Sequence, residues 1–233
     1  MAGTGRWAVV DADAPLVVEL LGQPGAGKTT LAHAAATTSE TLGRAELGAA
    51  WRQLPAIRKG LVLWQAIRNG ACLAQATRLV LGEPLLRWDS IARLARLLVK
   101  SHWTRSQSRP LLLEEGALQD LWSIYYSAGK MEPDLQLLAP LVRCLYRDVN
   151  ARIVLLQVES TIAFDRIRGR RDGKSRLDPL PEAELWRRLA GTAQLPHRLA
   201  DAARLAGLPV ETLDVSRPIE TSVSRLRAIM RDS

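Results

Sequence analysis

Residues 16–30 read LVVELLGQPGAGKTT, and this stretch decides the fold. A short apolar run precedes a glycine-rich turn, and an alanine-rich segment with strong helix formers follows it. The fixed positions of the phosphate-loop pattern G-x-x-x-x-G-K-[ST], also called Walker A, are filled by Gly22, Gly27, Lys28 and Thr29. A strand before this pattern and a helix after it are the context in which it binds nucleotides. The stretch therefore predicts a nucleotide-binding P-loop.

The residues of this loop suit a bound polyphosphate with Mg²⁺. Glycines leave room for backbone N–H groups to turn toward the phosphates. Lys28 would bring positive charge to the β- and γ-phosphates, and the Thr29 hydroxyl can ligate the metal. We expect ATP and Mg²⁺ as cofactors. The predicted nucleotide-binding residues are Gly22, Gln23, Pro24, Gly25, Ala26, Gly27, Lys28, Thr29 and Thr30.

The composition of the 233-residue chain is that of one large α/β domain. Hydrophobic residues make up 47% of it, enough for a sizeable core, and the net charge is +8. Most of the positive charge is arginine, which suits phosphate-rich ligands or nucleic acid, but also arginines spread over solvated helices. We expect a single P-loop kinase-like domain over residues 1–233, with an inserted helical lobe at 44–109.

The N-terminal sequence and the lengths of the apolar runs favour a cytoplasmic protein. The N-terminal residues lack a basic segment followed by an apolar core, and no apolar run is long enough to span a bilayer. Cys72 and Cys144 lie far apart in apolar helical surroundings, outside any C-x-x-C pair. We therefore expect buried free thiols in place of a disulfide or a zinc site.

Residues 111–116 read LLLEEG, the pattern of a buried parallel strand that ends at the active-site edge of a sheet. Glu114 and Glu115 should therefore lie near the nucleotide phosphates. One would join the Mg²⁺ shell and the other would accept a proton from the acceptor hydroxyl. Strand alternation predicts that their side chains point to opposite faces, so that one of them faces solvent. We assign Glu114 to the metal and Glu115 to the acceptor.

A basic segment at 163–178, AFDRIRGRRDGKSRLD, follows a predicted strand at 152–158 and the start of a helix. Its six basic residues are Arg166, Arg168, Arg170, Arg171, Lys174 and Arg176. A flexible basic segment is suited to closing over a triphosphate and neutralising charge in the transition state. An RNA-binding patch and a solvated loop are the alternatives. We favour a lid, with Arg166, Arg170 and Arg176 as the residues that contact the transferred phosphoryl group.

The lobe at 44–109 is helical by its pattern and rich in tryptophan and arginine. Its tryptophans fit the core of amphipathic helices, but they also fit a substrate lobe in which tryptophan stacks a planar group and arginine holds an anion. The sequence leaves these two interpretations open.

The order of these segments resembles that of P-loop kinases of nucleotides and nucleosides, and most of all the thymidylate kinase-like branch. The likeness lies in GQPGAGKTT, in DRIRGRRDGKSRLD, and in a last strand VETLDV followed by SRPIE and a helix. It covers residues 16–38 and 111–232. The resemblance implies a P-loop NTPase-type three-layer α/β sandwich with a parallel sheet, a helical substrate lobe and an Arg-rich lid.

Two features depart from that branch. Thymidylate kinases carry an Asp-Arg pair at the end of the strand that corresponds to LLLEEG, where this chain has Glu114 and Glu115. The missing arginine would help to hold the phosphate of the acceptor. The Arg-Glu-Pro signature of the acceptor region is absent, and GEP at 82–84 is a poor substitute. The acceptor is therefore left open.

We expect ATP- and Mg²⁺-dependent phosphoryl transfer to a small-molecule acceptor, in the manner of a nucleoside monophosphate kinase. A kinase of a sugar, nucleoside or antibiotic hydroxyl is the first alternative. A regulatory or nucleic-acid-binding P-loop ATPase is the second, and would bind RNA or DNA in a salt-sensitive manner. No membrane partner is expected, nucleic acid is not favoured, and a homodimer stays open.

Overall fold

The structure is a computed structural model, and it describes residues 16–35, 52–68, 70–83, 88–107, 110–170 and 177–231. Within these ranges the chain forms a parallel sheet of four strands in the order β2-β1-β3-β4. The strands are β1 (Leu16–Leu21), β2 (Leu111–Leu113), β3 (Asn150–Gln157) and β4 (Val210–Asp214). The register pairs Val18 of β1 with Leu112 of β2 and Arg152 of β3.

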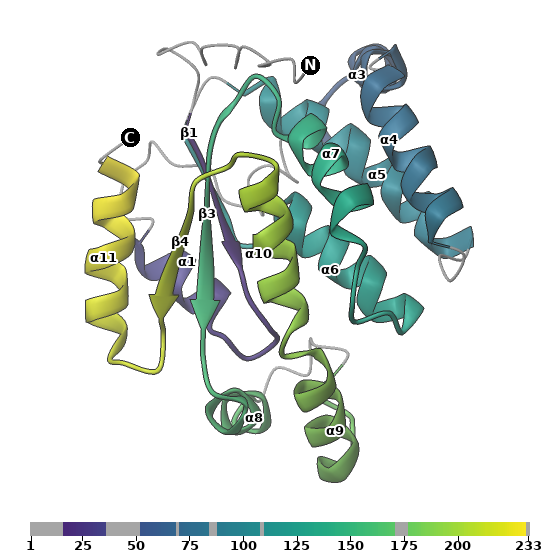
Figure 1. Cartoon of the computed structure of the whole chain (residues 1–233). Coiled ribbons are helices and arrows are strands. Elements are labelled where there is room, and N and C mark those ends of the chain that lie inside the picture. The colour runs from purple at the N-terminus through teal and green to yellow at the C-terminus, as the bar shows by residue number, and fades with distance from the viewer. Residues whose placement is uncertain are drawn as a thin grey trace, which may run out of the picture.

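Ten helices surround the sheet in the described part of the chain (Figure 1). Before β2 come α1 (Lys28–Ala35), α3 (Ala56–Arg68), α4 (Gly70–Gly82) and α5 (Trp88–Arg105). After β2 come α6 (Ala117–Ala128), α7 (Leu135–Leu145), α8 (Ser160–Arg168), α9 (Glu182–Thr192), α10 (Leu195–Leu205) and α11 (Ile219–Arg231).

The two faces of the sheet are buried under different helices. Val18 and Leu20 of β1 belong to a core that includes residues of α1 and α11. Val17 and Leu21 face the other way, into a larger core with residues of α5, α6, α7 and α10. Because both faces are covered, the strands are apolar almost throughout. The result is the three-layer α/β sandwich expected from the sequence (Figure 1).

The predicted strands at 16–21 and 152–158 and the predicted last strand VETLDV correspond to β1, β3 and β4 to within two residues at each end. The lobe expected at 44–109 contains α3, α4 and α5 where it is described. The lid is different. Its first residues belong to α8, so the expectation of one flexible segment over 163–178 is wrong for 163–168.

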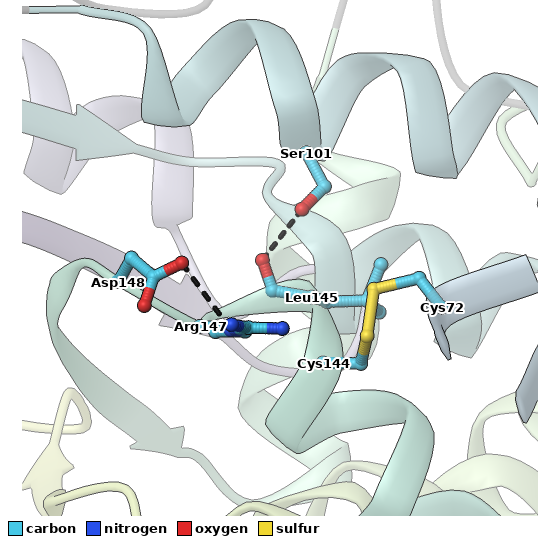
Figure 2. Close-up of a disulfide and its surroundings, with 6 residues drawn as sticks. All are labelled: Cys72, Ser101, Cys144, Leu145, Arg147 and Asp148. Carbon is cyan, nitrogen blue, oxygen red and sulfur yellow. Dashed lines mark hydrogen bonds and ion pairs between the residues drawn. A yellow bond between two sulfur atoms is a disulfide. The ribbon is translucent and has the colours of Figure 1, made fainter. Parts of the chain in front are cut away.

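Cys72 of α4 and Cys144 of α7 form a disulfide, with their Cα atoms 5.4 Å apart (Figure 2). The expectation of free thiols is therefore wrong. The two cysteines are 72 residues apart in sequence, and they meet because α4 packs along α7. Near the end of α4, the buried carboxylate of Glu83 forms an ion pair with Lys130 and accepts a hydrogen bond of 3.0 Å from the Asp134 N–H. The disulfide and the Glu83 contacts thus both fasten the α4 end of the lobe to the core.

No helix in the ranges described above has the length and the apolar character needed to cross a membrane.

Loss of the disulfide should lower the free energy of unfolding by about 4 kcal/mol, because the cross-link closes a long loop in the unfolded chain. Urea unfolding of the oxidised protein, the reduced protein and the Cys72→Ala/Cys144→Ala variant measures this. The reduced protein and the variant should share one lower midpoint, and reductant should leave the variant unchanged. Two titratable thiols in the denatured but unreduced protein would contradict the disulfide.

Candidate active site

The glycine-rich loop connects the carboxyl end of β1 to α1 and passes close to α8. Gly25 and Gly27 have φ values of +82° and +81°, a conformation that glycine adopts without strain. A Cβ on Gly25 would also overlap the backbone carbonyl of Ala163 in α8. Position 25 therefore requires glycine for two independent reasons, and the loop is packed against the first turn of α8.

Lys28 begins α1 and folds back over the loop. Its Nζ donates hydrogen bonds to the carbonyl oxygens of Gly22 at 2.7 Å and Gln23 at 3.1 Å. Burial lowers the pKa of Lys28 to about 8. The negative charges of Glu115 and Glu114 oppose this shift, and the positive charge of Arg170 adds to it. The structure thus brings two predicted carboxylates and one predicted lid arginine into the electrostatic surroundings of the loop lysine.

Glu114 and Glu115 lie in the bend between β2 and α6, and both are half-buried. The expectation that one of them faces solvent is wrong, because β2 ends at Leu113 and strand alternation does not extend to the pair. Within the described residues, Oε2 of Glu114 is buried without a hydrogen-bond partner. A buried carboxylate oxygen in this situation is a good candidate for a ligand contact.

The available oxygens fit a magnesium ion held together with a nucleotide. Thr29 is exposed at the first turn of α1, and Glu114 offers its unpartnered oxygen. Among the described residues no group of three or more His, Cys, Asp or Glu residues could hold a metal by itself. Mg²⁺ in nucleotide sites commonly takes one or two carboxylates and completes its shell with phosphate and water. The donor set therefore agrees with this type of site.

The arginines of the predicted lid make contacts with different parts of the structure. The Arg166 guanidinium donates to the carbonyl of Val215 at 2.8 Å, and it lies 3.7 Å from the place that a Cβ at Gly27 would occupy. Arg168 forms an exposed ion pair of 2.9 Å with Glu182 at the start of α9. Arg176 lies outside the described residues. Two of the predicted lid arginines, Arg166 and Arg170, thus lie near the phosphate loop.

Sequence reasoning missed several polar residues around this site. Lys100 of α5 donates to the backbone carbonyl of Glu115 at 2.6 Å and to the Asp120 carboxylate at 2.7 Å. The Gly22 N–H donates to Oε1 of Gln119 at 3.5 Å. Lys100, Asp120 and Gln119 lie in amphipathic helices, where polar residues are ordinary and carry no signal. Glu19 did carry one, because it is a charged residue inside an apolar strand.

The tryptophans of the lobe differ in how far they are exposed. The ring of Trp64 is on the surface, with 57% of the residue exposed, so this tryptophan is not part of a core. Trp103 is half-buried. Trp51 and the side chain of Trp88 lie outside what the structure describes.

No protein-family model and no curated protein matches this sequence. Solved structures similar to the chain include two of deoxyadenosine kinase from M. mycoides. The structure with bound dCTP is 14% identical and covers 93% of this chain and 100% of its own, with a TM-score of 0.49. The structure with bound dATP is 14% identical and covers 92% and 98%, also with a TM-score of 0.49. A likeness of this degree carries no argument for function, which rests on the residues of the site.

Nucleotide affinity should fall as the pH rises through about 8, because free Lys28 loses its proton there while bound phosphates favour its charged form. The dissociation constant of a non-hydrolysable ATP analogue should be about tenfold higher near pH 9 than near pH 7. Titration calorimetry across this range measures it. Lys28→Arg keeps its charge at every pH used and should give a flat profile. A wild-type profile as flat as that of the arginine variant would contradict the assignment.

Proposed function

We propose that this chain transfers a phosphoryl group from Mg·ATP to a hydroxyl group of a small-molecule acceptor. The observation that carries the proposal is that the loop lysine and two carboxylates, Glu114 and Glu115, follow the carboxyl ends of two neighbouring parallel strands, β1 and β2. The charges of both carboxylates affect the pKa of Lys28. Phosphoryl transfer requires a positively charged cradle for the phosphates and a group that orients the attacking hydroxyl. The site contains candidates for both.

On the donor side, the loop backbone and Lys28 would hold the β- and γ-phosphates. Thr29 and Glu114 would hold Mg²⁺, which neutralises phosphate charge when bound. Arg166 and Arg170 are the candidates for contact with the migrating phosphoryl group, because both lie at the loop. Arg176 is a third candidate on the basis of sequence alone.

On the acceptor side, Glu115 would orient or deprotonate the attacking hydroxyl. Its backbone carbonyl is held by Lys100, which fixes the turn that carries it. Two carboxylates in this turn would repel an acceptor that already carries a phosphate. This charge pattern favours a hydroxyl of an unphosphorylated sugar, nucleoside or antibiotic as the acceptor.

A nucleoside monophosphate, the acceptor that the thymidylate kinase-like resemblance implies, is the second candidate. Arg170 is the observation that favours it, because a guanidinium this close to the loop lysine can bind an acceptor phosphate as well as a donor phosphate.

Substitution of the two carboxylates should change different kinetic parameters. Glu115→Gln should lower kcat by roughly 10²- to 10⁴-fold, the usual contribution of a general base, with little change in nucleotide affinity. Glu114→Gln should raise the Mg²⁺ concentration needed for half-maximal rate. Steady-state kinetics over a Mg²⁺ series separates the two effects. Glu132→Gln, an exposed residue in the turn before α7, is the matched control and should behave as wild type.

ATP consumption by the purified protein against a panel of acceptors tests the function itself. The panel contains nucleosides, sugars, aminoglycosides, nucleoside monophosphates and an oligonucleotide with a 5′-hydroxyl, and Lys28→Ala is the control. We expect turnover with an unphosphorylated hydroxyl compound, and its loss in the variant. Turnover with a nucleoside monophosphate would select the second candidate. ATP hydrolysis stimulated by RNA or DNA alone would contradict both and indicate a nucleic-acid-dependent ATPase.

A further inference from the structure

Glu19 is a fully buried carboxylate in the middle of β1, three residues before the phosphate loop. It points to the same face as Val17 and Leu21, toward the core under α5, α6 and α7. Burial raises its pKa to about 7, although hydrogen bonds from Tyr146 and Gln119 lower it. An apolar residue at this position would avoid the desolvation cost. Stability alone therefore does not explain a glutamate here.

The carboxylate joins two helices to the central strand. Its Oε1 accepts a hydrogen bond of 3.0 Å from the backbone N–H of Gln119, in the first turn of α6. Its Oε2 accepts a hydrogen bond from the hydroxyl of Tyr146, the C-cap residue of α7. Burial and the Glu19 charge raise the pKa of Tyr146 well above its usual value, so this hydroxyl keeps its proton and stays a donor.

Gly116 is matched to this arrangement. A Cβ at Gly116 would overlap the Glu19 carboxylate, so the glycine after Glu114 and Glu115 lets that carboxylate reach the start of α6. The turn that carries the two candidate catalytic carboxylates is thus built around the side chain of Glu19.

The contact continues to the phosphate loop. Gln119, whose backbone is held by Glu19, accepts the Gly22 N–H with its side chain. Gly22 is the first residue of the loop. A single chain of hydrogen bonds therefore runs from Tyr146 through Glu19 and Gln119 to the loop.

The charged groups around Glu19 come from the neighbouring helices. Lys100 of α5 lowers its pKa and Asp120 of α6 raises it, and these two form an ion pair with each other. Arg105 of α5 lines the same small cavity as Glu19. Lys100 and Asp120 therefore satisfy each other's charge without a ligand, which argues for a role of Glu19 in placing the neighbouring backbone.

We propose that Glu19 is a positioning residue of the active site, which holds the β2–α6 turn and the phosphate loop in register with each other. This inference rests on the proposed function of that loop. It predicts that removing the carboxylate loosens the loop and the turn together, while an amide of the same shape keeps them in place.

Four variants separate positioning from mere packing. Glu19→Leu removes both hydrogen bonds and the buried charge. Glu19→Gln retains an oxygen for the Gln119 N–H and can pair with Tyr146 through its amide. Val17→Ala lines the same cavity from the same strand and reduces packing without touching the hydrogen bonds. Gln119→Met is the second route to the same break, because it removes the side chain that accepts from Gly22 and leaves the Glu19 contact intact.

Amide hydrogen exchange of the nucleotide-free proteins is the first measurement, and it needs no knowledge of the reaction. Glu19→Leu should increase exchange by about tenfold or more in residues 22–27 and 114–120, and Glu19→Gln should stay within about twofold of wild type. Val17→Ala should leave these two segments unchanged relative to the rest of the sheet. Unchanged exchange in both Glu19→Leu and Gln119→Met would overturn the proposal. Gln119→Met carries the test if the leucine variant does not fold.

Binding of Mg·ADP is the second measurement. Glu19→Leu and Gln119→Met should each weaken binding by about tenfold, and the double variant should be no weaker than either, because both break one chain of contacts. Wild-type affinity in both single variants would overturn the positioning role. Absence of nucleotide binding in the wild-type protein would instead overturn the proposed function, and the exchange result would still decide the role of Glu19.

Discussion

The close approach of the phosphate loop to α8 is the constraint on which the site depends. The loop passes so close to the backbone carbonyl of Ala163 that there is no room for a side chain at position 25. Arg166 of α8 lies near Gly27 and donates to the carbonyl of Val215, and Lys28 folds back onto the carbonyls of Gly22 and Gln23. Burial lowers the pKa of Lys28, so that a bound phosphate would gain a strong electrostatic partner.

The charges of the site come from the segments that follow β2 and β3, the two strands on either side of β1. Arginines arrive from α8 and the residue after it, and carboxylates arrive from the bend between β2 and α6. Two side chains bind the backbone on either end of that bend. Lys100 donates to the carbonyl of Glu115, and Glu19 accepts from the N–H of Gln119. Glu115, Arg170 and Glu114 all contribute to the electrostatic surroundings of Lys28, so charges of both signs are brought together at the loop.

The helical lobe is attached to the core more firmly than its sequence indicates. The disulfide between Cys72 and Cys144 and the buried pair of Glu83 with Lys130 both fasten α4 to the helices behind the sheet. Since α5 carries Lys100, the same lobe reaches the turn of the carboxylates. Disulfides are typical of oxidising surroundings, and the cytoplasmic location expected from the sequence stays a prediction.

The sequence by itself determined the strands, most of the helices and the phosphate loop, because these follow from local patterns: apolar runs, helical periodicity and the G-x-x-x-x-G-K-T spacing. It also indicated that Glu114 and Glu115 lie near Lys28, since the carboxyl ends of parallel strands share one edge. Only the tertiary structure decided that both carboxylates are half-buried, that the two cysteines pair, and that Glu19 contacts the start of α6. Those outcomes depend on where a strand stops and how distant helices pack, and neither is encoded in the spacing of neighbouring residues.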